Sequence, residues 1–105
     1  MTTSRMMVNL TPHTITLNDG RVFQSRGIAR VSNTFSDFVN DVCTVEYGDI
    51  EGLPDPAPNT FYIVSAIVLA TAKSAGRTDC VAPATGHPDC VRKDGFIVSV
   101  PGFVK

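Results

Sequence analysis

The chain has 105 residues, which is long enough for one domain with a hydrophobic core of its own. Hydrophobic residues make up 43% of it and charged residues 18%, proportions that are typical of an ordered globule and exclude a disordered chain. Nine basic and ten acidic residues give a net charge of -1, so there is no positive surplus for binding duplex nucleic acid.

The chain begins with a pattern of short strands. Residues 1–5 are expected to form a flexible tail. Residues 6–10 and 14–17 alternate apolar with polar side chains, which is the pattern of half-buried strands. Asn18-Asp19-Gly20 predicts a hairpin turn, because these residues tolerate the positive φ angles that such turns need, and residues 21–23 then return as a strand.

The middle of the chain mixes strand and loop signals. Ile28 and Val31 indicate a further strand. Residues 32–41 are short and polar with phenylalanines at helical spacing, and we expect a loop with no more than one turn of helix. Residues 42–47 contain good strand formers, whereas residues 48–59 hold three prolines and two glycines and predict a rigid, extended loop.

Residues 60–64 (TFYIV) are the best strand candidate, and their apolar side chains on both faces predict a central place in the sheet. Ser65 follows as an N-cap, residues 66–75 have the composition of a helix, and Gly76 is a typical C-terminal stop. This helix is apolar nearly all round, so we expect it to be buried, either under the sheet or at a contact between subunits of a homo-oligomer.

The last segments complete the predicted fold. Residues 77–88 predict a loop in which Cys80 and Val81 can pair with a neighbouring strand. Asp94-Gly95 predicts a second turn, and residues 96–100 predict a final strand. Many short strands with one helix indicate an α+β fold: a single domain, residues 1–105, with a small, mostly antiparallel β-sheet and one buried short α-helix.

Cysteine usage and hydropathy indicate the compartment. Three cysteines, an odd number, favour a reducing environment, and the first ten residues (MTTSRMMVNL) contain no signal-peptide core. The longest apolar run, residues 66–70, is too short to cross a bilayer, so we expect a cytoplasmic protein with no membrane partner. Cys80, His87 and Cys90, with Cys43 as a fourth ligand, match zinc-site spacing only in part, and we predict neither a metal nor a cofactor.

The segment NLTPH at residues 9–13 interrupts two strand-like runs and permits two interpretations. In the first, Pro12 kinks a strand at a sheet edge, and the threonine hydroxyl caps a backbone group that the kink frees. In the second, Asn9, Thr11 and His13 alternate along an extended segment, point to one side and bind a ligand. The second interpretation predicts Asn9, Thr11 and His13 as binding residues.

A second group of polar residues flanks the predicted helix. Ser65 caps the helix start, where free N–H groups and the positive end of the helix dipole also suit phosphate or carboxylate. Arg77 and Asp79 follow the helix end, either as a clamp within the loop or as an arginine fork for an anion, oriented by the aspartate. We therefore add Ser65, Arg77 and Asp79 to the candidate ligand-binding residues.

No motif predicts a catalytic residue. The sequence around Ser65 lacks the Gly-x-Ser-x-Gly turn of hydrolase nucleophiles, and no glycine-rich phosphate loop precedes the helix. A hydrolase that uses His13 with Glu51 or Asp79 is therefore the least supported interpretation. The sequence favours a binding function over an enzymatic one.

Four stretches occur in a characteristic order: NLTPH at 9–13, EGLPDPAPNTFYIVS at 51–65, RTDCVAP at 77–83 and DGFIVSVPGF at 94–103. Together they resemble a family of small proteins that are encoded by bacteriophages and by bacterial genomes, often within prophages. The resemblance covers nearly the whole chain, and only residues 32–45 depart from the family pattern. It implies a setting, the cytoplasm of a host bacterial cell, and no particular chemistry.

Two functions from different classes are consistent with these observations. The first is a binding protein that captures a small anionic or nucleotide-like ligand and so counters a host process; the hydrogen-bonding groups at predicted strand ends support it. The alternative is an interaction protein that binds and modulates a host protein. Its support is the rigid loop at residues 53–58, with Phe35 and Phe38 on the expected surface, because aromatic side chains are common anchors at interfaces.

Overall fold

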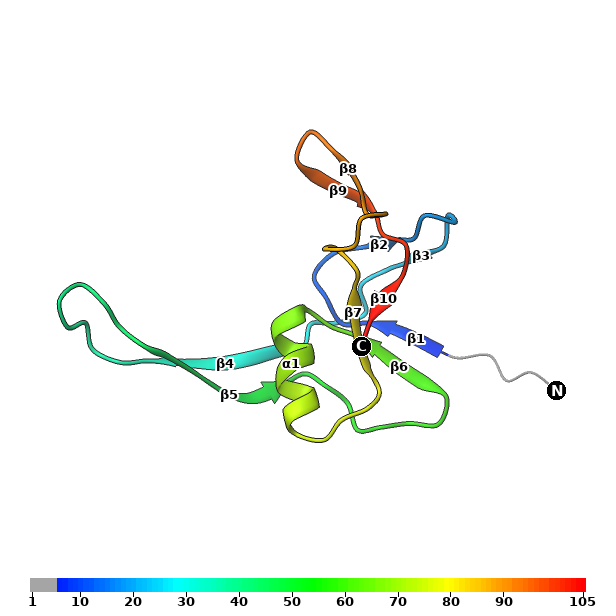
Figure 1. Ribbon diagram of the computed structural model, residues 1–105. Coiled ribbons are helices and arrows are strands. Elements are labelled where there is room, and N and C mark those ends of the chain that lie inside the picture. Colours follow the sequence, from blue (N-terminus) through cyan, green and yellow to red (C-terminus); the bar gives the residue numbers. More distant parts are fainter. Residues whose placement is uncertain (1–5) are drawn as a thin grey trace.

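The computed structural model describes residues 6–105 (Figure 1). Its centre is a four-stranded sheet in the order β1-β6-β7-β10, which consists of β1 (Met6–Asn9), β6 (Thr60–Ile63), β7 (Cys80–Pro83) and β10 (Phe103–Val104). β6 is parallel to both β1 and β7, and β10 is antiparallel to β7. The tail predicted at residues 1–5 lies outside the described residues.

One helix, α1 (Ala66–Ser74), connects the parallel strands β6 and β7 and packs on one face of the sheet (Figure 1). It begins after the N-cap Ser65, whose hydroxyl accepts a hydrogen bond from the Val68 amide at 3.3 Å. It ends before Gly76, which has a φ of 89°, a conformation that glycine adopts without steric cost. The predicted helix and both of its caps are confirmed.

The central sheet separates two hydrophobic clusters, because successive residues of a strand point to opposite faces. Tyr62 and Val64 pack with α1 in the first cluster, whereas Ile63 and Val81 belong to the second. The second cluster also contains Val100, which lies beside the hairpin at the other face. β6 is thus apolar on both faces and lies between two strands, as its sequence predicts.

Three hairpins extend from this core. β2 (Ile15–Thr16) and β3 (Val22–Phe23) flank the predicted turn at residues 18–20 and stay close to the body. The other two hairpins project from it (Figure 1): β4 (Arg30–Phe35) with β5 (Val45–Glu51), and β8 (Val91–Lys93) with β9 (Phe96–Ser99). We name residues 30–51 the long arm and residues 91–99 the short arm.

The two arms give the molecule an open shape. Its radius of gyration is 15.8 Å and its principal extents are 57 × 38 × 21 Å, whereas a compact domain of about 100 residues has a radius of gyration of about 13 Å. In Figure 1 the long arm reaches out to one side of the sheet and the short arm leaves in another direction. The predicted turn at Asp94-Gly95 forms the tip of the short arm, with both residues at positive φ.

The long arm corrects two predictions. Residues 32–35 belong to β4 and not to a loop, because the chain turns sharply at Asn40-Asp41, with φ angles of 51° and 67°. Asn and Asp tolerate these left-handed conformations, so a two-residue hairpin forms where the phenylalanine spacing suggested helix. β5 also begins later than predicted and continues to Glu51, so the proline-rich loop starts only after the strand.

α1 buries one face and leaves the other open, which corrects the expectation of burial nearly all round. Val68, Leu69 and Ala72 are buried, but Ile67 is 54% exposed. The exposed residues of the helix are Ala66, Ile67, Ala70, Lys73 and Ser74.

The α+β fold class with one short helix is confirmed. Four of the six strand pairings are antiparallel, and the two parallel pairings lie in the central sheet. Within residues 6–105, the structure contains no helix with the length and apolar character needed to cross a membrane.

Candidate functional site

Asn9 and Thr11 form a hydrogen-bonded latch at the end of β1. The Asn9 amide nitrogen donates to the carbonyl oxygens of His13 and Phe23 at 2.8 and 2.9 Å. The Asn9 side-chain oxygen accepts from the amide and the hydroxyl of Thr11 at 2.9 and 2.7 Å. Asn9 is 1% exposed and Thr11 is 8% exposed. We name these residues the Asn9 latch, which ties the bend after β1 to strand β3.

The bend turns the His13 side chain away from the latch and toward solvent. His13 is exposed, and its imidazole makes no hydrogen bond with any of residues 6–105, whereas its carbonyl oxygen accepts from both Asn9 and Thr11. Pro12 restricts the backbone at this bend and has no N–H group that would need a partner. The polar groups of Asn9 and Thr11 are therefore engaged by the chain's own backbone, as the first interpretation of NLTPH predicts.

Arg77 and Asp79 form a clamp at the end of α1. The Arg77 Nε and Nη2 atoms donate to the two carboxylate oxygens of Asp79 at 2.9 and 2.8 Å, and Nη2 also donates to the Pro54 carbonyl at 2.9 Å. The guanidinium lies 6.0 Å from the centre of the Tyr62 ring. This clamp fastens the proline-rich loop to the helix end.

The clamp also shifts the pKa values of Arg77 and Asp79 in directions that favour their charged forms. The hydrogen bonds from Arg77 hold the pKa of the Asp79 carboxyl below its ordinary value, and those bonds raise the pKa of Arg77 in turn. The two side chains are only 20% and 15% exposed, so the pair is largely shielded from water. A guanidinium that is matched by its own carboxylate offers little attraction to a second anion.

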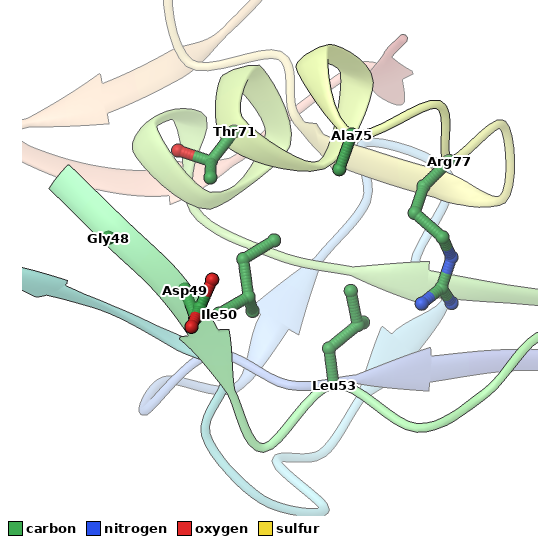
Figure 2. Close-up of a pocket in the computed structure, with 7 residues that line it drawn as sticks. All are labelled: Gly48, Asp49, Ile50, Leu53, Thr71, Ala75 and Arg77. Atoms are coloured by element: carbon green, nitrogen blue, oxygen red, sulfur yellow. The ribbon is translucent and has the colours of Figure 1, made fainter.

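An open hollow of about 320 Å³ lies between the base of the long arm and α1 (Figure 2). Arg77 and Asp49 stand at its two sides in Figure 2, with Ile50 and Leu53 between them. Asp79 neutralises Arg77, and Asp49 forms no ion pair within residues 6–105, so this hollow lacks the positive surplus that a small anion requires. The residues that line it are Gly48, Asp49, Ile50, Leu53, Thr71, Ala75 and Arg77.

The six candidate residues lie in three places. Asn9 and Thr11 meet at the latch, and His13 takes part only through its backbone carbonyl, with its side chain exposed. Ser65 lines a second hollow, of about 260 Å³, beside the start of α1, and the Arg77–Asp79 clamp follows the end of the helix. The nine-residue helix, about 14 Å long at 1.5 Å per residue, separates Ser65 from the clamp. The structure thus brings residues together within each group and not between the groups.

The largest concentration of exposed apolar side chains lies on the two arms. Of the fifteen large hydrophobic residues that are exposed within residues 6–105, six lie on the long arm and four on the short arm. These are Phe35, Phe38, Val39, Val42, Val45 and Tyr47, and Val91, Phe96, Ile97 and Val98. The sequence identified only Phe35 and Phe38 as surface residues, because the valines of a strand look the same whether the strand is buried or projects.

Three exposed residues form an apolar stripe on one face of the long arm. Phe35 pairs with Val45 across the strands, and Tyr47 follows two residues later on the same face. Closer to the body this face continues into Val31 and Ile50, which pack against the first hydrophobic cluster. The stripe, defined as Phe35, Val45 and Tyr47, is therefore an outward continuation of the core. A signal for it was present in the sequence, namely the turn-forming pair Asn-Asp between two valines.

The thiol groups are dispersed over the fold. Cys80 is buried in β7, and its burial raises the pKa of its thiol, while Cys43 and Cys90 are half-buried. Within residues 6–105, no three His, Cys, Asp or Glu side chains lie close enough together to hold a metal ion.

No protein-family model matches the chain, and neither the curated proteins nor the solved structures give a significant match. The function is therefore inferred from the residues and their geometry.

Proposed function

We propose that the protein is an interaction module that binds another protein through its long arm. The observation that carries this proposal is the apolar stripe of Phe35, Val45 and Tyr47, which is 64%, 40% and 53% exposed on a two-stranded hairpin. A hairpin of two strands is only marginally stable in water, and a partner that covers the stripe would complete it. Aromatic residues of this kind are common anchors in protein interfaces.

The charge of the long arm specifies the chemistry of the partner. The arm carries one basic residue, Arg30, and five acidic ones: Asp37, Asp41, Glu46, Asp49 and Glu51. Opposite charges around an apolar contact promote encounter and suppress wrong partners. The partner surface is therefore an apolar protein surface that carries lysine or arginine beside its apolar side chains. The family resemblance adds the setting, the cytoplasm of a host bacterium, where the partner is a host or phage protein.

Capture of a small anion draws less support from the same geometry. Asn9 and Thr11 already satisfy one another and the backbone, and Arg77 is matched by Asp79. A hydrolase that uses His13 with Asp79 is supported even less, because the carboxylate of Asp79 is engaged by Arg77.

The proposal is tested by crosslinking in a bacterial host. A photo-crosslinking phenylalanine analogue replaces Phe38, which is 74% exposed near the arm tip, and a matched control replaces Val22, which is 53% exposed on the β2–β3 hairpin. We expect a discrete protein adduct from position 38 and none from position 22. The double variant Phe35→Ser/Tyr47→Ser should abolish the adduct while the melting temperature changes by no more than about 3 °C, because exposed side chains contribute little to stability.

Two results would overturn the proposal. One is the absence of any protein adduct from position 38. The other is a small anion that copurifies with the protein at equal molar amount and is lost from the Arg77→Ala variant, since this would assign the clamp to ligand capture.

A further inference from the structure

We propose that the partner of the long arm is the short arm of a second copy of this chain, so that the protein assembles head to tail. This inference rests on the proposed function and names the partner. It follows from three observations on the two arms: their charges, their apolar faces and their directions.

The charges of the two arms are opposite. The long arm has a net charge of -4, from five carboxylates and one guanidinium. None of these five carboxylates forms an ion pair within the part of the chain that the structure describes. The short arm has Arg92 and Lys93 against Asp94, a net charge of +1, and all three are exposed. Each chain thus carries one arm of each sign.

Charge also decides between the two ways in which identical chains can pair. A symmetric contact of long arm with long arm would bring two charges of -4 together, within the screening distance of about 10 Å at moderate salt. A contact of long arm with short arm brings opposite charges together instead. This contact joins different surfaces of the two copies, and such heterologous contacts close into rings or extend into filaments.

The apolar residues of the short arm match the stripe of the long arm. Phe96 is 77% exposed and lies directly across the short arm from Lys93, so one face presents an aromatic ring and a cation together. On the long arm, Phe35 and Tyr47 supply aromatic faces, which attract both apolar side chains and a lysine ammonium. Ile97 and Val98 add further exposed apolar surface to the short arm.

The directions of the arms make this an intermolecular contact. In Figure 1 the long arm extends to the left of the central sheet and the short arm extends to the top, so the two tips lie far apart in the view. The short arm of the same chain therefore does not cover the stripe, whereas the short arm of a second copy is free to do so.

The test measures the molar mass of the purified full chain by light scattering and native mass spectrometry. We expect the wild type to form species several times the mass of one chain. Association should weaken at least about tenfold when salt rises from about 0.1 M to about 1 M, because the screening length falls from about 10 Å to about 3 Å. Two charge-reversal variants supply the specificity. Asp37→Lys/Glu46→Lys/Asp49→Lys takes the net charge of the long arm from -4 to +2, and Arg92→Glu/Lys93→Glu takes that of the short arm from +1 to -3.

Each variant alone should associate at least about tenfold more weakly, because its two arms then repel. An equimolar mixture of the two should recover assemblies in which the variants alternate, since every contact between them again joins opposite charges. Circular dichroism of each variant confirms that it is folded. A short-arm variant that assembles like the wild type would overturn the inference, because a symmetric long-arm contact does not need the short arm.

A monomeric wild type at about 0.1 M salt would also overturn the inference. The crosslinking experiment then separates the two proposals. An adduct from position 38 to a different protein leaves the proposed function in place and excludes self-assembly, whereas an adduct to residues 91–98 of a second copy supports both.

Discussion

Removal of the Asn9 side chain should destabilise the fold more than any change at an exposed polar residue near it. Asn9→Ala deletes four hydrogen bonds in a site that is 1% exposed. Each such bond contributes about 0.5–1.5 kcal/mol, so the expected loss is on the order of 4 kcal/mol. Domains of this size have about 5–15 kcal/mol in total, and the change therefore removes a large fraction of the stability.

The assay is thermal and urea unfolding of the wild type and three variants. For a domain of about 100 residues, 1 kcal/mol shifts the melting temperature by about 4–8 °C, so Asn9→Ala should melt about 20 °C lower. Asn9→Asp keeps the oxygen that accepts from Thr11 but places a carboxylate oxygen against the carbonyls of His13 and Phe23. It should therefore also be destabilised at neutral pH.

The matched control is His13→Ala, two residues from the latch partner Thr11. The His13 side chain is exposed and unbonded among the described residues, so this variant should melt within about 2 °C of the wild type. A structural role for the Asn9 latch would be refuted if Asn9→Ala melted within about 3 °C of the wild type, or if His13→Ala were as destabilising as Asn9→Ala.

Three further predictions follow from burial, charge and backbone geometry. Val68→Asp should prevent folding, because it buries an unpaired charge, whereas Ile67→Asp should remain folded by circular dichroism; equal effects would contradict the packing of α1. The pair of Arg77 with Asp79 lowers the pKa of the carboxyl, so its stabilisation is present above the ordinary value of 3.8 and is lost as pH falls through the lower folded value; Arg77→Ala should flatten that acid-side loss in urea titrations, and an unchanged slope would refute it. Gly52→Ala should lower the melting temperature by several degrees, because φ is 82° and the added Cβ meets the Ile28 carbonyl oxygen; a neutral result would show that the base of the long arm relaxes.

Local signals predicted the elements that depend on local chemistry. The helix was found from its serine cap, alanine-rich body and terminal glycine, and the turns at residues 18–20 and 94–95 from residues that accept positive φ. The central position of β6 was found from its lack of polar alternation. The long arm was predicted only in part. Contacts between residues far apart in the sequence decide whether a strand packs on the core or projects from it, and sequence periodicity does not reveal such contacts.

The candidate site was predictable to a similar extent. Sequence spacing brought Arg77 and Asp79 together correctly, because residues two apart on a segment that leads into a strand point to the same side. It did not reveal that the Asn9 side chain reaches back to the Phe23 carbonyl, since that contact depends on the return of β3 to the sheet. It placed Ser65 and Arg77 at opposite ends of one helix, but it did not reveal that they line different hollows.

The parallel pairing of β1 with β6 has a consequence for the order of folding. Met6 pairs with Thr60, so β1 pairs with a strand that follows the whole long arm in the sequence. This pairing can form only after β6 has come into contact with β1. Hairpins close within about 1–10 μs, whereas sheets that join distant segments fold in about milliseconds to seconds. The long arm therefore forms early on a chain whose central sheet is still open. Because loop-closure entropy grows by only about 0.6 kcal/mol for each doubling of length, the arm could be lengthened or exchanged with little effect on the closing of that sheet.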